Sequence, residues 1–320
     1  MWRSDRGVVG PTILRQDDVP ALNRLFSDAF TDRYRRDGMH GVRVPYLNPA
    51  VWRYAIANAG DGAFAWRDGR GAPVAFNLAH RSGREGWMGP LAVRQDHQGR
   101  GLGRNIVQEG IRWLQASGAT TIGLETMPRT VDNIGFYSRL GFQPGPLTIT
   151  LQGDAARLGR PYGTALGSLD TEQQRSAIRS CADLVTELGG VGDYSREARL
   201  TLDLGLGDVL LDIDDSGSIN GFAIWHRAAL AQDRPAEDGR ILKLVARDSG
   251  GALRLVRGVG DAAARIGLPG VSLRCQAEFG ELYQGLIAER FQVQWTDLRM
   301  VLASHPAPVV TGVVLSNWEI

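Results

Sequence analysis

The sequence contains very little lysine and cysteine. Lys243 is the only lysine among 36 Lys and Arg residues, and the net charge at pH 7 is +1. A chain this close to neutral has no overall electrostatic attraction to nucleic acid or to a membrane surface. Cys181 and Cys275 are the only cysteines, so neither a disulfide framework nor a metal site is expected, and a reducing compartment is favoured.

Long apolar runs are also missing. The N-terminal MWRSDRGVVG has no apolar core long enough for a signal peptide, and no window approaches the length of a membrane span. A cytoplasmic protein is therefore expected. The 320 residues are 43% hydrophobic and 22% charged, which is an ordinary globular composition over a length that suits two domains.

A glycine-rich basic segment, MGPLAVRQDHQGRGLGR, occupies residues 88–104. Its apolar residues 91–93 predict a buried strand, and a helix is predicted from about residue 101 to 117. The loop between them has glycines at 99, 101 and 103 beside Arg100 and Arg104. Glycines let backbone N–H groups approach a ligand, and the helix N-terminus adds unpaired N–H groups and a positive dipole end. The segment therefore predicts an anion-binding loop.

Two common phosphate loops do not fit this segment. The pattern G-x-x-x-x-G-K-[ST] is absent, and the dinucleotide pattern G-x-G-x-x-G with a later acidic residue does not match. The segment instead resembles the pyrophosphate loop Q/R-x-x-G-x-G/A of the GNAT superfamily of N-acyltransferases, through Val93, Asp96, Gln98, Gly99, Gly101 and Gly103. A second stretch, NIGFYSRLGF at residues 133–142, is similar to the family's downstream block through Asn133, Tyr137, Gly141 and Phe142.

The predicted elements of the first half follow an α+β order. A strand at 12–14 precedes an amphipathic helix at 17–30, an aperiodic segment at 31–48 that is a loop or a short helix, and a helix at 49–59. Strands at 63–67, 73–80 and 86–93 have short turns between them and predict an antiparallel meander. After the helix at 101–117 come a strand at 120–127, a helix at 131–140 and a strand at 142–151, interrupted by two prolines. The GNAT fold implied by the resemblance has this order, with a mixed, mostly antiparallel twisted sheet flanked by helices.

The second half repeats much of this order. A helix is predicted at 172–188, strands at 208–213, 219–226 and 241–246, a helix at 251–266, a strand at 271–276, a helix at 280–289 and strands within 292–303. It therefore resembles a degenerate GNAT module, with Val245 in the place of Val93, no glycine loop, and leucines at 282 and 286 where Asn133 and Tyr137 stand. We divide the chain into a catalytic module at 1–152, a linker at 153–171 and a degenerate module at 172–320.

The resemblance implies acetyl-CoA as the cofactor. Main-chain groups of Leu91, Ala92 and Val93 would hold the pantetheine arm and polarise the thioester. The pyrophosphate would lie on the loop formed by Gln98, Gly99, Arg100, Gly101, Leu102, Gly103 and Arg104. Asn133 and Phe136 fall at cofactor-contacting positions, although Asn133 also suits a helix cap. Tyr137 falls on the tyrosine that protonates the departing thiolate; the alternative is a packed core residue.

The general base and the acceptor site are less defined. Glu125, beside the expected gap between strands, and Glu85, at the start of the strand leading to Leu91, are candidate bases, and a water relay is an equal alternative. Tyr34, Arg35 and Tyr46 belong to a candidate acceptor wall within 31–48, whose alternative is an exposed basic loop. His97 is expected to be exposed. No metal site is expected.

The pattern as a whole predicts an acetyl-CoA-dependent N-acetyltransferase acting by direct transfer on the primary amine of a small molecule, such as an amino sugar, an amino acid derivative or an amine antibiotic. The alternatives are a non-catalytic acyl-CoA-binding sensor or scaffold, a protein or peptide N-acetyltransferase, and an enzyme of this fold that takes longer acyl groups. Neither nucleic acid nor membrane is expected as a partner, and the chain is expected to be a monomer or a homodimer.

Overall fold

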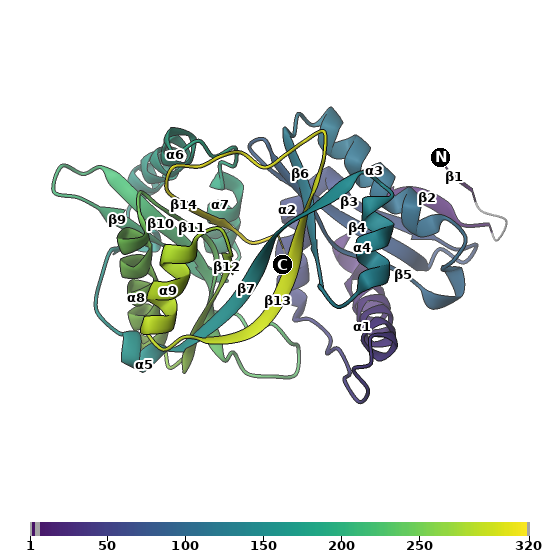
Figure 1. Cartoon of the computed structure of the whole chain (residues 1–320), viewed down its shortest axis with the longest axis horizontal. Coiled ribbons are helices and arrows are strands. Elements are labelled where there is room, and N and C mark those ends of the chain that lie inside the picture. Colours follow the sequence, from purple (N-terminus) through teal and green to yellow (C-terminus); the bar gives the residue numbers. More distant parts are fainter. Residues whose placement is uncertain (1, 4–6, 319–320) are drawn as a thin grey trace.

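The computed structural model describes residues 2–3 and 7–318 (Figure 1). Residues 1 and 4–6 of the N-terminal segment MWRSDRGVVG, for which no signal peptide is predicted, lie outside the described residues. Within the described residues, no helix is both long and apolar enough to cross a bilayer.

The first half follows the predicted order closely. Its strands are β1 (Trp2–Arg3), β2 (Val9–Ile13), β3 (Ala63–Arg67), β4 (Pro73–Ser82), β5 (Glu85–Val93), β6 (Thr121–Thr126) and β7 (Phe142–Asp154). Its helices are α1 (Val19–Arg36), α2 (Pro49–Ala59), α3 (Leu102–Ala116) and α4 (Val131–Ser138). The Asn48 side chain caps α2, and Pro49 opens it, as its fixed φ allows.

Two predictions in this half are wrong. The helix predicted to end at residue 30 continues to Arg36, because Arg33 and Arg36 form i,i+4 ion pairs with Asp37 and Asp32 that extend the last turns of α1. The last strand is also not interrupted by its prolines. β7 runs through Pro144 and Pro146, where its pairing with β13 (Gln292–Leu302) has a register shift and β12 (Gly270–Gln276) does not yet pair with it, which is a position where a strand tolerates proline. From Thr148 to Asp154 β7 pairs with β12 as well.

The second half contains four elements that the sequence analysis did not predict. Its helices are α5 (Ala155–Leu158), α6 (Thr171–Glu187), α7 (Ser195–Asp203), α8 (Ser249–Arg265) and α9 (Gly280–Ala288). Its strands are β8 (Thr164–Ala165), β9 (Gly207–Ile213), β10 (Ile219–His226), β11 (Asp238–Ala246), β12 (Gly270–Gln276), β13 (Gln292–Leu302) and β14 (Val313–Ser316). The missed elements are α7, β14, α5 and β8. The last two lie within residues 153–171, which the sequence analysis expected to be a linker, so that expectation was wrong where β7 ends and where α5 and β8 form.

The strands of both halves join into one 14-stranded sheet across the described residues, in the order β1-β2-β3-β4-β5-β6-β13-β7-β12-β11-β10-β9-β8, with β14 beside β11. The last long strand of each half has exchanged places: β13 pairs with β6 of the first half, and β7 pairs with β12 of the second half. β7 and β13 also pair with each other and cross together between the two halves (Figure 1). The two modules therefore share their central strands.

Helices cover both faces of the sheet in the same way in each half. The α3–α8 face is covered by α3 and α4 over the first half and by α5, α8 and α9 over the second. The α2–α7 face is covered by α1 and α2 and then by α6 and α7. Side chains alternate between these faces along each strand, so that Met300 of β13 points into the core under α3 while Arg299 points to the α2–α7 face.

Candidate active site between strands β5 and β6

Strands β5 and β6 separate along their length. They pair in parallel only from Glu85 with Thr121 to Met88 with Leu124. Beyond Met88, β5 continues to Val93 beside β4 alone, with a register shift opposite residues 77–79. Residues 89–91 are half-exposed while both ends of β5 are buried. We call this opening the splay and its paired end, at Met88 and Leu124, the vertex.

The glycine loop begins where β5 ends. The Gln98 side-chain Nε2 donates to the carbonyl of Val93 at 2.8 Å, which fixes the loop to the strand. Gly99 and Gly101 have φ values of 74° and 81°, and a Cβ on either would meet no atom within 4 Å. Gly101 is the N-cap of α3, so the unpaired first-turn N–H groups of the helix lie at the loop. Together these features form an open, positively polarised cradle.

The other predicted cofactor residues lie around the same opening. Leu91 is half-exposed in the splay, whereas Ala92, Val93 and Leu102 are buried in the core. Arg100 and Arg104 are exposed. Phe136 of α4 lies 3.7 Å from the position of a Cβ on Gly103, so α4 borders the loop.

Tyr137 and Asn133 lie on α4. Tyr137 is 6% exposed and packs its ring against Phe136 and Phe142. Burial raises the pKa of Tyr137 well above its usual range, so its hydroxyl stays protonated at neutral pH. Asn133 Nδ2 lies 3.4 Å from the Thr126 hydroxyl at the end of β6, which places Asn133 beside the outer end of the splay.

Glu125 is the first residue of β6 beyond the vertex, and its side chain has no exposed surface. Its carboxylate accepts from Arg274 Nη2 at 2.7 Å, from Arg299 Nε at 2.9 Å and from the Thr148 hydroxyl at 2.6 Å. Burial by itself would raise the pKa of Glu125, but attraction to the two guanidinium groups outweighs it and lowers the pKa to about 2. A carboxylate held in this way is a weak proton acceptor, so these contacts disfavour Glu125 as the base.

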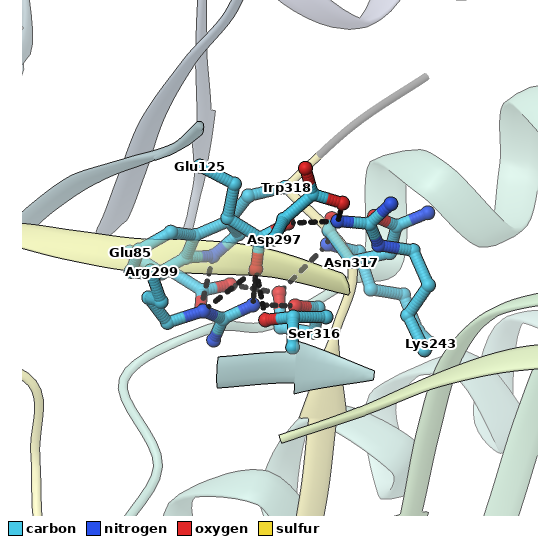
Figure 2. A network of polar contacts seen from close by, with 10 residues as sticks. Glu85, Glu125, Lys243, Asp297, Arg299, Ser316, Asn317 and Trp318 are labelled. Carbon is cyan, nitrogen blue, oxygen red and sulfur yellow. Dashed lines mark hydrogen bonds and ion pairs between the residues drawn. The ribbon is translucent and has the colours of Figure 1, made fainter. Parts of the chain in front are cut away.

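Glu85 lies at the closed end of the paired region. Its carboxylate accepts from the Ser316 hydroxyl at 2.8 Å and from Trp318 Nε1 at 3.1 Å. Figure 2 shows these contacts as one part of a buried polar network that also contains Arg299, Asp297 and Lys243. The sequence analysis did not single out Ser316 or Trp318, because no motif marks them.

Lys243, the only lysine, is buried on the α2–α7 face near Glu85. Its Nζ donates to the Ser316 hydroxyl at 2.8 Å and to the Asn317 carbonyl at 2.9 Å, and it lies 4.2 Å from the centre of the Trp87 ring. Burial lowers the pKa of Lys243, and the charges of Glu85 and Glu197 oppose that shift. This lysine therefore anchors residues 316–318, which we call the tail segment, between the two modules.

The candidate acceptor wall is only partly open. Tyr34 faces Trp295 of β13 with ring centres 6.2 Å apart, and Arg35 is exposed. Tyr46 is half-buried, and its carbonyl accepts from Gln232 of the second half at 2.8 Å. The other arginines of this segment pair with acidic side chains: Arg33 with Asp37 and Asp132, Arg36 with Asp32, and Arg43 with Asp28.

His97 is 6% exposed, so its expected exposure was wrong. Its Nδ1 lies 2.8 Å from an Asp96 oxygen, which satisfies the ring at the start of the loop. His80 is also buried; its Nε2 lies 3.0 Å from the carbonyl of Gly89, and burial lowers its pKa to about 3. A neutral His80 therefore donates to the strand at the vertex.

The equivalent gap in the second half is filled by protein. β11 and β12 pair in parallel only as far as Ile241 with Leu273. Beyond that point β14 pairs with β11, from Lys243 with Ser316 to Ala246 with Val313, alongside Val245, the counterpart of Val93. At the start of α8, Asp248 caps the helix by accepting from the Gly251 N–H at 2.7 Å. Leu282 and Leu286 are fully buried in the core. Each part of the first-half site is thus replaced in the second half. A strand occupies the gap, an acidic cap stands at the helix N-terminus, and apolar side chains stand where Asn133 and Tyr137 do in the first half.

Comparison with known proteins agrees with this arrangement. Residues 20–142 match the model of the acetyltransferase (GNAT) family. A protein from Pyrococcus horikoshii, provisionally described as an acetyltransferase, is 16% identical with a TM-score of 0.65 over 98% of this chain and 96% of its own. A tandem GNAT protein from the clavulanic acid biosynthesis pathway is 13% identical with a TM-score of 0.61, over 94% and 99% of the two chains. N-myristoyltransferase from Saccharomyces cerevisiae, solved with myristoyl-CoA, is 12% identical with a TM-score of 0.62, over 98% and 86%.

Proposed function

We propose that this protein transfers an acetyl group from acetyl-CoA to the primary amine of a small molecule, because residues 20–142 match the acetyltransferase (GNAT) family model and the whole chain shares the fold of a tandem GNAT protein. The observation that carries this proposal is the asymmetry of the two gaps. The first is open beside a glycine loop and a helix N-terminus, and the second is filled by β14. Only the first module would then be catalytic.

The residues around the splay suit an acyl-CoA. The loop at 98–104 would hold the pyrophosphate by backbone N–H groups, and the half-exposed residues 89–91 would face the thioester. When bound, acetyl-CoA supplies an activated acyl carbon. An N–H group near Leu91 would stabilise the oxyanion that forms when the amine attacks.

Tyr137 is the proposed general acid. Its raised pKa keeps the proton on its hydroxyl at neutral pH, ready for the departing thiolate. Glu125 and Glu85 are both engaged in the buried network, so we assign removal of the ammonium proton to water rather than to either carboxylate. An amine needs only mild deprotonation, and a water relay is sufficient for it.

The length of the transferred acyl group is considered separately below, because the N-myristoyltransferase of similar fold was solved with a long-chain acyl-CoA.

Among the possible acceptors, we propose a small amine. Tyr34 and Trp295 stand close together across the α2–α7 face, and most arginines nearby are already paired within the chain. This arrangement favours a compact acceptor over an extended peptide.

Thiol release from acetyl-CoA with a panel of amines tests the proposal. We expect amine-dependent release by the wild-type protein, and a 10²- to 10⁴-fold lower rate for Tyr137→Phe with unchanged CoA affinity, because only the proton donor is removed. Tyr283→Phe on α9 is the matched control in the second module and should leave the rate unchanged.

The outcomes separate the alternatives. CoA binding without amine-dependent release by the wild type would favour the sensor or scaffold over the enzyme. A Tyr137→Phe rate equal to that of the wild type would remove Tyr137 from the mechanism. Acetylation of peptide N-termini in preference to free amines, read by mass spectrometry, would overturn the small-molecule acceptor.

A further inference from the structure

The tail segment closes the vertex of the splay. Trp318 is 2% exposed, and its ring lies directly on Gly123, where a Cβ would come within 2.1 Å of the ring. Gly123 pairs with Trp87 one residue inside the vertex. On the other strand, a Cβ on Gly89, the first unpaired residue of β5, would lie 3.3 Å from the Trp318 carbonyl. Trp318 therefore contacts both strands at the point where they separate.

Trp318 is held rigidly in this position. Its Nε1 donates to Glu85 at 3.1 Å, and the Arg299 guanidinium lies 3.8 Å from the centre of its ring. The preceding residues are fixed by Lys243 through the Ser316 hydroxyl and the Asn317 carbonyl. Figure 2 shows these groups converging on the tail from both modules. An indole with this many contacts cannot move aside at low cost.

The opposite side of the vertex has no room either. Met88, Leu124 and Met300 are at most 2% exposed and form part of the core under α3. An acyl chain that passes the vertex can thus extend only on the α2–α7 face, where Trp318 lies.

We propose that Trp318 sets the length of the acyl group that this protein accepts, and limits it to short chains. This inference rests on the proposed function, in which the pyrophosphate lies at the glycine loop and the thioester near Leu91. Leu91 and Gly89 are two residues apart, or roughly 7 Å along a strand. With carbon–carbon bonds of about 1.5 Å, an acetyl or propionyl group is too short to reach Trp318 from the thioester, whereas an octanoyl chain is long enough to meet it.

Equilibrium binding of CoA, acetyl-CoA, butyryl-CoA and octanoyl-CoA tests the inference without requiring an acceptor. The wild type should bind acetyl-CoA at least as tightly as CoA, and octanoyl-CoA at least tenfold more weakly than acetyl-CoA. The variants Trp318→Phe, Trp318→Leu and Trp318→Ala should bind octanoyl-CoA increasingly tightly, with the largest gain for the smallest side chain. Each methylene of the acyl chain that gains an apolar environment should tighten binding roughly fourfold.

Trp225→Leu is the matched control, because it removes another buried indole, on β10 in the core of the second module. It should keep the wild-type chain-length profile. Melting temperatures of all variants identify any loss of fold, and the milder Phe and Leu changes keep the series informative if Trp318→Ala does not fold.

Failure of the wild type to bind any CoA compound would overturn the proposed function and this inference with it. CoA binding with equal affinity for octanoyl-CoA and acetyl-CoA would overturn the inference alone. A chain-length profile that Trp318→Leu and Trp225→Leu shift equally would also overturn it, because the effect would then not come from the vertex.

Discussion

The ion pairs of Glu125 with Arg274 and Arg299 should contribute measurably to the free energy of unfolding. The pKa of Glu125 falls from 4.5 to about 2 in the folded chain, which corresponds to about 3 kcal/mol of unfolding free energy at neutral pH. Removing one partner of a buried ion pair costs about 3–5 kcal/mol in general, a range that agrees. We therefore expect Glu125→Gln to lower the unfolding free energy by about 3 kcal/mol at pH 7.

The pH dependence follows from the direction of the shift. Because the folded-state pKa of Glu125 is depressed, its contribution is complete above pH 4.5 and is lost as the pH falls towards 2. The difference between wild type and Glu125→Gln should shrink to about 1 kcal/mol near pH 3. Urea unfolding followed by tryptophan fluorescence and circular dichroism at both pH values measures this difference.

Asp261→Asn is the control, since Asp261 pairs with an Arg265 side chain that is 63% exposed. It should cost at most about 1 kcal/mol at either pH. The reasoning is refuted if Glu125→Gln is no less stable than Asp261→Asn at pH 7, or if its deficit is the same at pH 3.

Two further predictions concern cofactor binding. Gly101→Val should weaken CoA binding at least tenfold, because a β-branched residue resists a φ of 81° and fills the loop. Gly118→Val carries the same strain at the other end of α3, with a φ of 84° and open space around it, and should leave CoA binding intact; an equal effect of both changes would refute the loop assignment. Isothermal titration should give one CoA per chain, because β14 fills the second gap, and a stoichiometry of two would show that the strand does not block it.

Most of the layout could be predicted from the sequence, because it depends on local periodicity. The strands from residue 63 to 93 follow from apolar runs separated by short turns, and the helix α3 follows from an apolar stripe that includes Ile106 and Leu114. The glycine loop was predictable for the same reason, since its spacing is contained within a few residues.

The exchange of β7 and β13 could not be predicted in this way. The residue pattern of each segment indicates a strand within a sheet, but it does not identify the strands with which that segment pairs. The partners of Glu125 have the same difficulty: Arg274 and Arg299 lie 149 and 174 residues away along the chain. From the sequence alone Glu125 was therefore a candidate base, although in the folded chain it pairs with the guanidinium groups of Arg274 and Arg299.

β14 was missed because VVLS is short and follows a loop rich in proline. The burial of most of its residues depends on its pairing with β11, which the local sequence does not specify. The tail segment after it has no motif at all, so the polar network of Figure 2 had no signal in the sequence.

The exchange of β7 and β13 has a consequence for the order in which the protein is made. Translation delivers β6 long before β13, its partner at residues 292–302. Until then the edge of β6 at Glu125, beside the splay, has no strand to pair with. A ribosome-bound chain that has completed only the first module therefore lacks the strand that pairs with β6 beside the candidate active site, and nascent chains should acquire CoA affinity only after the second half has emerged.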